Sequence, residues 1–298
     1  MNLKDFRKSL KPPTRIIGGG SVLVALLALN LLAWLAVYDL SRPAFLEVNF
    51  FDVGQGDAIF IETPEKYQIL IDGGPNSAIL EKLDGELPFW DNSLDLIILT
   101  HPEKDHLAGL LAVLKRYKVK NILWTGVTRD TAEFKEWQRL IQEEGAKIFI
   151  AKAGQKIKAG KTDFHILYPF ESLEGEDLKD TNNTSIILRL AVGGSSFLFT
   201  GDAYKSAEKE LVNEGLEISS DVLKIGHHGS KTSTAPEFIE KVLPEIAVIQ
   251  CGKDNSYGHP HPETLETLEK YGINILRTDL NGNIKIIFNG KNYEISNF

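Results

Sequence analysis

The chain has 298 residues, of which 43% are hydrophobic and 25% are charged, and its formal net charge is −8. Residues 1–38 carry five basic groups and one acid, so the rest of the chain holds 28 basic and 40 acidic residues, a net charge of −12. This balance excludes a protein that coats nucleic acid through bulk positive charge, and the single cysteine, Cys251, excludes an intrachain disulfide.

An uncharged segment over 16–38 follows the basic stretch 1–15. As a helix it would measure roughly 34 Å, enough to cross a bilayer. Because the positive charges precede it and Asp39 follows it, the positive-inside rule predicts a cytoplasmic tail (1–15), a single transmembrane anchor (16–38), a linker (39–44) and a domain outside the cytoplasmic membrane. A cleaved signal peptide is the alternative, although the run is long for one and no small-residue cleavage site follows.

Short apolar runs after Pro43 predict strands, first in hairpins and later alternating with helices. The predicted strands cover 45–53, 58–62, 67–71, 94–100, 119–124, 147–151, 163–168, 186–192, 196–200, 221–225, 246–250, 273–276, 284–288 and 292–295. Helical spacing predicts helices over 107–117, 131–144, 204–214, 236–242 and 262–271. This order favours an α/β domain over 45–298, with two mixed sheets packed face to face and covered by helices.

Imidazoles and carboxylates gather directly after predicted strands or in loops beside them. They are His101, Glu103, Asp105 and His106 after 94–100, Asp202 after 196–200, His227 and His228 after 221–225, and His259 and His261 within 257–262. Sites of α/β proteins collect at the carboxyl ends of strands, and ligands spaced this tightly can hold two cations close together. The remaining histidine, His165, lies inside a predicted strand and is interpreted as structural.

These motifs resemble a known family. His101-x-Glu103-x-Asp105-His106 resembles the His-x-His/Asp-x-Asp-His motif of the metallo-β-lactamase superfamily. The stretches 51–57, 70–74, 183–185, 199–202, 224–230 and 255–260 look like the hydrolase domain of ComEC/Rec2-type DNA-uptake (competence) proteins, and the similarity runs over 45–298. The multi-helix channel of those proteins has no counterpart in these residues.

The resemblance implies a metallo-β-lactamase αββα sandwich and a site for two divalent metal ions, zinc or manganese. It implies that His101 binds the first metal, that Asp105 and His106 bind the second, that Asp202 bridges both, and that His227 completes the second site. His228 is the less favoured of its pair, and His228 and His261 remain candidates for metal or substrate. Glu103 stands where the superfamily has His and this family usually has Asp, so whether it coordinates metal is open.

Further residues take supporting roles in the same interpretation. Asp105 would also orient the attacking water, and His259 would hold a phosphate oxygen or protonate a leaving group. Candidate substrate contacts are Lys231, Lys253 and Asn255, although the two lysines are equally consistent with ordinary surface charge. Asp57, Asp72 and Asn183 would support the ligands from behind.

The predicted function is metal-dependent hydrolysis of a phosphodiester by a two-metal-activated hydroxide, by family resemblance a nuclease for single-stranded DNA during competence. The predicted partners are the membrane, single-stranded DNA or another phosphodiester, and a channel-forming protein. A small phosphoester or a cell-envelope phosphodiester is the alternative substrate, and a non-catalytic metal-binding module is the alternative class.

Overall fold

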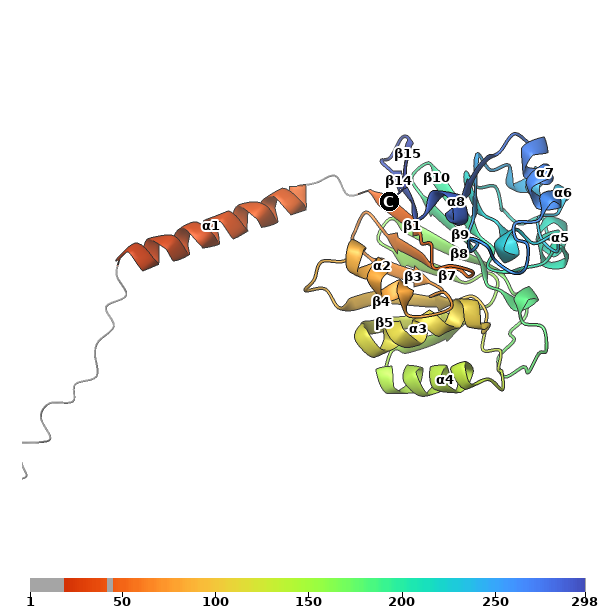
Figure 1. Cartoon of the computed structure of the whole chain (residues 1–298), viewed down its shortest axis with the longest axis horizontal. Helices are drawn as coiled ribbons and strands as arrows, with labels where there is room; N and C mark the ends of the chain where they lie inside the picture. Colours follow the sequence, from red (N-terminus) through yellow and green to blue (C-terminus); the bar gives the residue numbers. More distant parts are fainter. Residues whose placement is uncertain (1–18, 42–44, 298) are drawn as a thin grey trace, which may run out of the picture. The chain divides into compact units, whose positions relative to one another are not determined.

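The computed structural model describes residues 19–41 and 45–297, and the chain divides into two units, Met1–Pro43 and Ala44–Phe298. The described part of the first unit is one helix, α1 (Gly19–Ser41). All strands and the other helices belong to the second unit (Figure 1).

Helix α1 differs from the predicted anchor at both ends, since it begins at Gly19 and continues through Asp39 to Ser41. Residues 1–18, with the predicted cytoplasmic tail, and residues 42–44 of the predicted linker lie outside the described residues. Within 19–41 and 45–297, no helix combines the length and the apolar character needed to cross a bilayer. The predicted transmembrane anchor is therefore wrong, and so is the single-pass location with an external domain that was inferred from it.

The second unit contains two mixed sheets. The first sheet has eight strands in the order β15-β14-β1-β2-β3-β4-β5-β6. In chain order they are β1 (Leu46–Phe50), β2 (Ile59–Glu62), β3 (Gln68–Ile71), β4 (Ser93–Leu99), β5 (Lys118–Trp124), β6 (Lys147–Ile150), β14 (Ile284–Phe288) and β15 (Tyr293–Asn297). Strands β3 to β6 are parallel, and the hairpins on the other side are antiparallel.

The second sheet has seven strands in the order β13-β12-β11-β10-β9-β8-β7. They are β7 (Lys156–Ala159), β8 (Thr162–Tyr168), β9 (Ile187–Val192), β10 (Ser195–Phe199), β11 (Val222–Lys224), β12 (Ile246–Ile249) and β13 (Asn274–Arg277). Strands β10 to β13 are parallel, so their carboxyl ends meet at one edge of the sheet.

Helices cover the outer face of each sheet, which gives four layers (Figure 1). The first sheet carries α2 (Ala78–Glu86), α3 (Lys104–Arg116) and α4 (Ala132–Glu144), and the second carries α5 (Lys205–Asn213), α6 (Pro236–Val242) and α7 (Pro262–Lys270). Short helical turns complete the order: Asn182–Thr184, Gly226–Gly229 and α8 (Thr278–Asn281). The predicted αββα sandwich is confirmed.

The residues of β4 show why an apolar run of this kind becomes a central strand. Leu96 and Ile98 face the core between the sheets, where they join Phe50, Phe164 and Phe199. The alternate residues of β4 face the core beneath α2, α3 and α4. A strand buried on both faces needs apolar side chains at nearly every position, so it carries no alternating pattern.

Apart from the short helical turns, two regular elements of the second unit were not predicted. Helix α2 is short and contains Gly85, and its apolar face rests mainly on Ile79 and Leu83. Strand β7 has four residues and lies at the edge of its sheet, where it pairs on one side only. Both are held by their neighbours more than by their own periodicity.

Candidate metal centre

The candidate ligands come from the carboxyl ends of strands in both sheets. His101 follows β4, and the first turn of α3 presents Asp105 and His106. Asp202 follows β10, and the turn Gly226–Gly229 follows β11. The face-to-face packing of the sheets brings the segment after β4 together with those after β10 and β11, which follow it by roughly a hundred residues or more.

Asp105, His106, Asp202 and His228 form a cluster whose ligand atoms all lie within 4.8 Å of one another. Asp202 lies at its centre, with Oδ1 3.3 Å from His106 Nε2 and Oδ2 3.3 Å from His228 Nε2. Asp105 Oδ2 lies 3.3 Å from the same His228 nitrogen. Burial opposes ionisation of Asp202, but the two imidazoles hold its pKa well below the usual range. The cluster therefore presents carboxylate oxygens and imidazole nitrogens to one point.

The imidazole of His106 is held by Asp72, whose carboxylate is fully buried. Asp72 Oδ2 accepts a hydrogen bond from His106 Nδ1 at 2.8 Å, while Thr100 donates its backbone N–H to Oδ1 and its hydroxyl to Oδ2. Because Nδ1 carries the hydrogen in this bond, Nε2 of the neutral ring has a free lone pair that faces the cluster. Asp72 thus has the predicted place behind a ligand.

Two glycines allow α3 to approach this close to the loop after β3. A Cβ on Gly109 would lie 1.8 Å from the carbonyl oxygen of Gly73, and a Cβ on Gly73 would lie 2.5 Å from the backbone nitrogen of Leu110. Any side chain at either position would push α3 away and separate His106 from Asp72.

The rings of His228 and His101 are oriented in the same way. His228 Nδ1 donates to the carbonyl oxygen of Gln250 at 2.9 Å. His101 Nδ1 lies 3.1 Å from the Thr100 hydroxyl and 3.2 Å from the Ser185 hydroxyl. Thr100 gives its hydroxyl hydrogen to Asp72 and Ser185 gives its own to the carbonyl of Asn182, so His101 Nδ1 must be the donor. The Nε2 atoms of both rings then face the site: that of His101 has a free lone pair, and that of His228 donates to Asp105 Oδ2 at 3.3 Å.

The pKa values of these imidazoles differ because their neighbours differ. Burial opposes protonation of His106 and His228, but Asp202 raises the pKa of both well above the ordinary value, aided by Asp72 for the first ring and Asp57 for the second. Burial, together with the nearby charge of His106, lowers the pKa of His101 to about 3. His101 is thus neutral at physiological pH without help from a cation.

A buried lysine underlies the cluster and was not given a role from the sequence. Lys224 ends β11 with no exposed surface, forms an ion pair with Asp57 and donates to the carbonyl of Gly201 at 2.9 Å. Its Nζ also lies 3.8 Å from Asp202 Oδ1. The sequence contains a signal for this role, because Lys224 lies between Leu223 and Ile225 in an apolar run. A lysine at such a position is expected to be buried, and a buried lysine needs a charged partner.

His227 lies beside the cluster and is not part of it. Its Nε2 is 3.2 Å from the amide nitrogen of Asn182, which donates to it, and 3.9 Å from Asp202 Oδ2. Its Nδ1 contacts the hydroxyl of Thr232 at 2.9 Å. The sequence favoured His227 over His228 as the ligand, whereas the structure brings His228 into the cluster and engages the free lone pair of His227 elsewhere.

Glu103 turns toward another partner. Its Oε1 accepts a hydrogen bond from the Thr181 hydroxyl at 2.5 Å and lies 3.0 Å from Arg129. The extra methylene, compared with aspartate, lets the carboxylate reach these groups. Within residues 45–297, the Glu103 carboxylate forms no hydrogen bond or ion pair with the four clustered ligands, although its backbone carbonyl accepts from the N–H of His106.

The loop 252–261 is organised by Asn255. Its amide nitrogen donates to the carbonyls of Gly252 and His259, and its oxygen accepts from the backbone of Tyr257 and His259. His261 Nδ1 accepts a hydrogen bond from the backbone of Lys231 at 3.2 Å. Asn255 was predicted to contact substrate, and His261 to contact metal or substrate. In the structure, the side chains of both residues instead form hydrogen bonds with the backbone that shape the loop.

A cavity of about 180 Å³ opens above the cluster. It is lined by Gln55, Glu103, Asp105, Asn182, Asp202, His227, His228, Tyr257 and His259. Neither Lys231 nor Lys253 is among these residues, and Asn183 lies outside the lining with its oxygen accepting from the backbone of Tyr204.

His259 projects into this cavity with few constraints. Its Nδ1 lies 3.4 Å from the amide nitrogen of Gln55. Burial, together with His228 and His227, lowers the pKa of His259 to about 4. The ring is therefore neutral at physiological pH and suits proton acceptance better than proton donation.

Unpartnered atoms test whether the cluster fits a divalent cation. His101 Nε2, His106 Nε2 and Asp202 Oδ1 are all buried without a hydrogen-bond partner. Buried polar atoms of native proteins are nearly always paired, and three such atoms converge here on acidic and imidazole ligands. The mixture of oxygen and nitrogen donors suits zinc and also manganese. The residues fit a metal ion, with Asp105, His106, Asp202 and His228 as the group that would hold it.

Comparison with known proteins agrees with this geometry. Residues 51–253 match the family model of the Metallo-beta-lactamase superfamily, and the chain belongs to this superfamily. Its members are typically metal-dependent hydrolases.

Curated relatives of the chain include competence proteins. The chain is 38% identical over 257 residues to ComE operon protein 3 of Bacillus subtilis, which covers 80% of this chain and 32% of that protein. It is 33% identical over 240 residues to competence protein ComA of Neisseria gonorrhoeae, which covers 79% of this chain and 31% of that protein. The chain thus spans about a third of the length of the relatives it matches. The predicted family resemblance is confirmed.

Solved structures share the fold at low identity. The metallo-beta-lactamase fold protein YhfI from Bacillus subtilis matches with a TM-score of 0.55 and 15% identity, over 80% of this chain and 99% of that one. The diiron β-hydroxylase CmlA from Streptomyces venezuelae matches with a TM-score of 0.53 and 16% identity, over 83% of this chain and 54% of that one. These likenesses establish the architecture alone.

Proposed function

We propose that the protein is a metal-dependent phosphodiester hydrolase that cuts DNA, with single-stranded DNA as its substrate. The observation that carries this proposal is the cluster of Asp105, His106, Asp202 and His228, with unpartnered buried ligand atoms beneath an open cavity. The competence proteins among its relatives support DNA as the polymer.

A divalent ion at this cluster supplies Lewis-acid chemistry, since it lowers the pKa of water toward neutrality and offsets charge on a phosphoryl oxygen. Two ions would need His101 as a further ligand, and its free Nε2 supports that arrangement. The residues around the cluster hold the ligand side chains in place. Asp72 and the Gln250 carbonyl keep the Nε2 lone pairs of His106 and His228 directed at the cluster, and Asp105 can hold a proton of the attacking water.

His259 is placed to act on the substrate. It enters the cavity from the loop shaped by Asn255, on the side opposite α3, and it is neutral at physiological pH. We assign it a hydrogen bond to a phosphate oxygen of the substrate, because Gln55 Nε2 can only donate to its Nδ1 and the hydrogen of the neutral ring is then on Nε2. This keeps one of the two predicted roles and sets aside protonation of a leaving group, because the lowered pKa disfavours the protonated ring.

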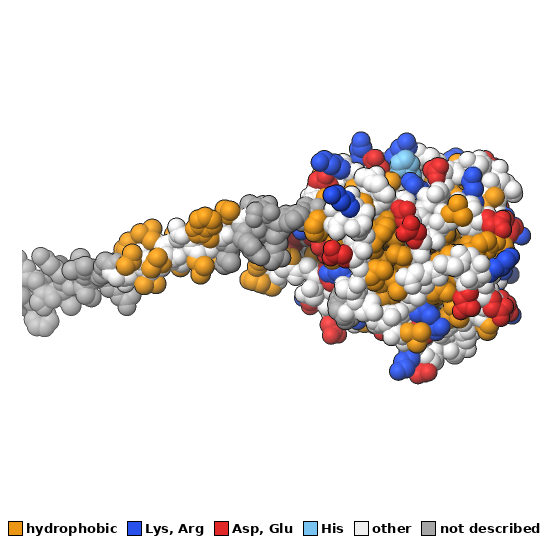
Figure 2. All heavy atoms as spheres, turned by 90° about the horizontal axis from the view of Figure 1, so that it is seen from above, with side chains coloured by type: hydrophobic (Ala, Val, Ile, Leu, Met, Phe, Trp, Pro, Cys, Tyr) orange, Lys and Arg blue, Asp and Glu red, His pale blue; other side chains and the backbone are white. Residues whose placement is uncertain are grey.

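The surface near the site gives DNA little electrostatic guidance. The cavity wall contains carboxylates and no lysine or arginine. On the face of the second unit drawn in Figure 2, basic and acidic side chains are interspersed. Affinity for DNA would then depend on the metal ions more than on a basic groove. A channel-forming partner protein that presents the strand would offset this weakness.

A small phosphoester is the second candidate substrate. The cavity of about 180 Å³ favours it, because this volume suits one phosphoester group better than a wrapped polymer.

The test uses the full chain, stripped of metal and reloaded with zinc or manganese. Bis(p-nitrophenyl) phosphate and labelled single-stranded DNA serve as substrates, with Asp202→Asn as the inactive variant. His165→Ala is the matched control, because His165 lies in β8 away from the cluster. We expect cleavage of both substrates, loss on chelation and in Asp202→Asn, and full activity in the control.

Each other outcome has a defined meaning. Cleavage of the small diester alone would favour the second candidate. If the chain binds metal but cuts neither substrate, the hydrolase proposal fails and a non-catalytic metal-binding module remains.

A further inference from the structure

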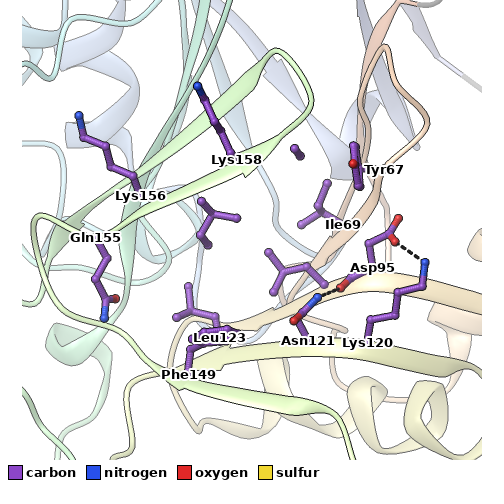
Figure 3. A pocket seen from close by; sticks show the side chains of 13 residues that line it. Tyr67, Ile69, Asp95, Lys120, Asn121, Leu123, Phe149, Gln155, Lys156 and Lys158 are labelled. Carbon is purple, nitrogen blue, oxygen red and sulfur yellow. Dashed lines mark hydrogen bonds and ion pairs between the residues drawn. The ribbon is translucent and has the colours of Figure 1, made fainter.

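A second, larger cavity lies at the opposite end of the sheets from the metal centre. It has a volume of about 630 Å³ and is lined by the beginnings of β3, β4 and β5 together with β6 and β7 (Figure 3). Asp95 lines it, and His101 follows the other end of the same strand, so roughly 20 Å separates the two sites at about 3.3 Å per residue. The cavity is therefore distinct from the candidate active site.

The interior of this cavity is apolar. Ile69, Leu96 and Leu123 form its inner wall and are buried in the core between the sheets. Ile157 and Phe149 continue the apolar wall toward the mouth, and the ring of Phe149 is 39% exposed. An apolar cavity of this volume is in the range of small-molecule sites.

Most polar groups around the mouth already have partners. Asp95 pairs with Lys120 at 2.7 Å and accepts from the backbone of Gln68. The amide of Asn121 donates to the carbonyl of Asp95, and the amide of Gln155 bridges two backbone groups of its own turn. These groups are therefore already engaged within the protein.

Two lysines and a tyrosine on the rim differ from them. Across residues 45–297, Lys156 has no ion pair and the Tyr67 hydroxyl has no hydrogen bond, while Lys158 has only Asp163 at 4.0 Å. Lys156 and Lys158 alternate with Ile157 along the edge strand β7, and in Figure 3 their amines point away from the apolar side chains of the cavity. Their flexible four-carbon stems are long enough for the amines to turn toward the mouth. With Lys120 and Asp95 included, the lining has a net charge of +2, in a chain whose net charge is −8.

We propose that this cavity binds a small amphiphilic anion, an alkyl chain with a single carboxylate or phosphate head group. The chain lies against Ile69, Leu96 and Leu123, which removes apolar surface from water. The head group lies at the mouth beside Lys156 and Lys158. Charge complementarity selects an anion over a neutral or cationic amphiphile, and the enclosed apolar wall selects an alkyl chain over a free phosphate.

Calorimetric titration of the full chain tests this site, with octanoate, decanoate and decyl phosphate as probes and decyltrimethylammonium as the cationic counterpart. We expect one saturable site, with decanoate about tenfold tighter than octanoate because two methylenes are added. The cationic probe is expected to bind about tenfold more weakly than decanoate.

Two variants locate the site. The double variant Lys156→Glu with Lys158→Glu, at two exposed positions, is expected to weaken decanoate binding by about tenfold. Ile157→Trp fills the cavity and is expected to abolish decanoate binding. Lys241→Glu with Lys270→Glu is the matched control, because both lysines are exposed on α6 and α7. Since all of these variants keep α1 unchanged, loss of binding assigns the probe to the cavity.

The inference is overturned if decanoate shows no saturable binding, if the lysine pair variant binds as tightly as the control, or if decyltrimethylammonium binds as tightly as decanoate. Tighter binding of decanoate than of decyl phosphate identifies a carboxylate ligand, and the reverse order identifies a phosphate. Neither result depends on the proposed hydrolase activity.

Discussion

Replacement of Asp72 by asparagine tests the orientation of the metal ligands. The carboxylate accepts three hydrogen bonds, from the Thr100 N–H at 2.8 Å, the Thr100 hydroxyl at 2.7 Å and His106 Nδ1 at 2.8 Å. Asparagine can keep the first through its oxygen, but its amide nitrogen replaces the atom that accepts the other two. His106 must then accept at Nδ1 and carry its hydrogen on Nε2, where the metal would bind.

The expected loss follows from this change of tautomer. Substitution of the group that orients a ligand histidine costs about 10- to 100-fold in metal affinity, which corresponds to about 1.4–2.7 kcal/mol. Competition between the protein and a chromogenic chelator for zinc measures the affinity. Nitrogen-15 spectra of the zinc-loaded protein report which ring nitrogen of His106 carries the hydrogen.

Asp91→Asn is the control for this experiment. Asp91 also accepts three hydrogen bonds, from Gln68 and from the N–H and hydroxyl of Ser93, but it contacts no histidine. The zinc affinity of the Asp91→Asn variant should therefore equal that of the wild type. If Asp72→Asn binds zinc within about twofold of the wild type while His106 Nε2 stays unprotonated, the reasoning on the tautomer is refuted.

Three further predictions concern other buried groups. His228→Ala should abolish zinc binding at the cluster in the chelator assay while His227→Ala retains it, and the reverse order would restore His227 as the ligand. Lys224→Met leaves the carboxylate of Asp57 buried without its cation and should lower the free energy of unfolding by about 3–5 kcal/mol in urea titrations, a loss that Asp57→Asn in the same chain should partly reverse. Burial raises the pKa of Glu208 to about 7 from 4.5, so its contribution to stability is complete below pH 4.5 and is lost as the pH rises through 7. Glu208→Gln should remove this pH dependence, so between pH 5 and 8 the difference in free energy of unfolding between the variant and the wild type should change by about 3 kcal/mol. Free energies of unfolding that follow parallel pH profiles in the two proteins would contradict this prediction.

The fold could be predicted where burial dictates residue type along a whole element. Strand β4 is an example, because both of its faces are covered and almost every position must be apolar. Helix α2 and strand β7 lack this constraint, since one has only two buried apolar residues and the other lies at a sheet edge. The segment 16–38 shows the opposite error, because a continuous apolar run was interpreted as a membrane span that the structure does not support.

The candidate site was predictable in its chemistry and less so in its geometry. Ligand types at strand ends indicated a metal centre, because sheets gather their carboxyl ends. The sequence placed His227 ahead of His228, whereas the structure brings His228 into the cluster, because adjacent residues in a turn point in different directions that only the backbone angles define. It also could not show that Glu103 would reach Arg129, or that Lys224 would pair with Asp57, because both contacts join segments distant in the chain.

The turn that carries the two histidines supports a functional origin for the cluster. His227 and His228 have φ angles of 49° and 54°, in the left-handed region that costs a residue with a side chain roughly 1–2 kcal/mol. Glycine would relieve this cost at either position, and Gly226 and Gly229 flank the pair. The turn holds because the N–H of His227 donates to the Gly201 carbonyl and His228 Nδ1 donates to the Gln250 carbonyl. Folding alone gives no reason to retain two imidazoles in this backbone, whereas a metal centre needs one of them at the cluster and uses the other beside the cavity.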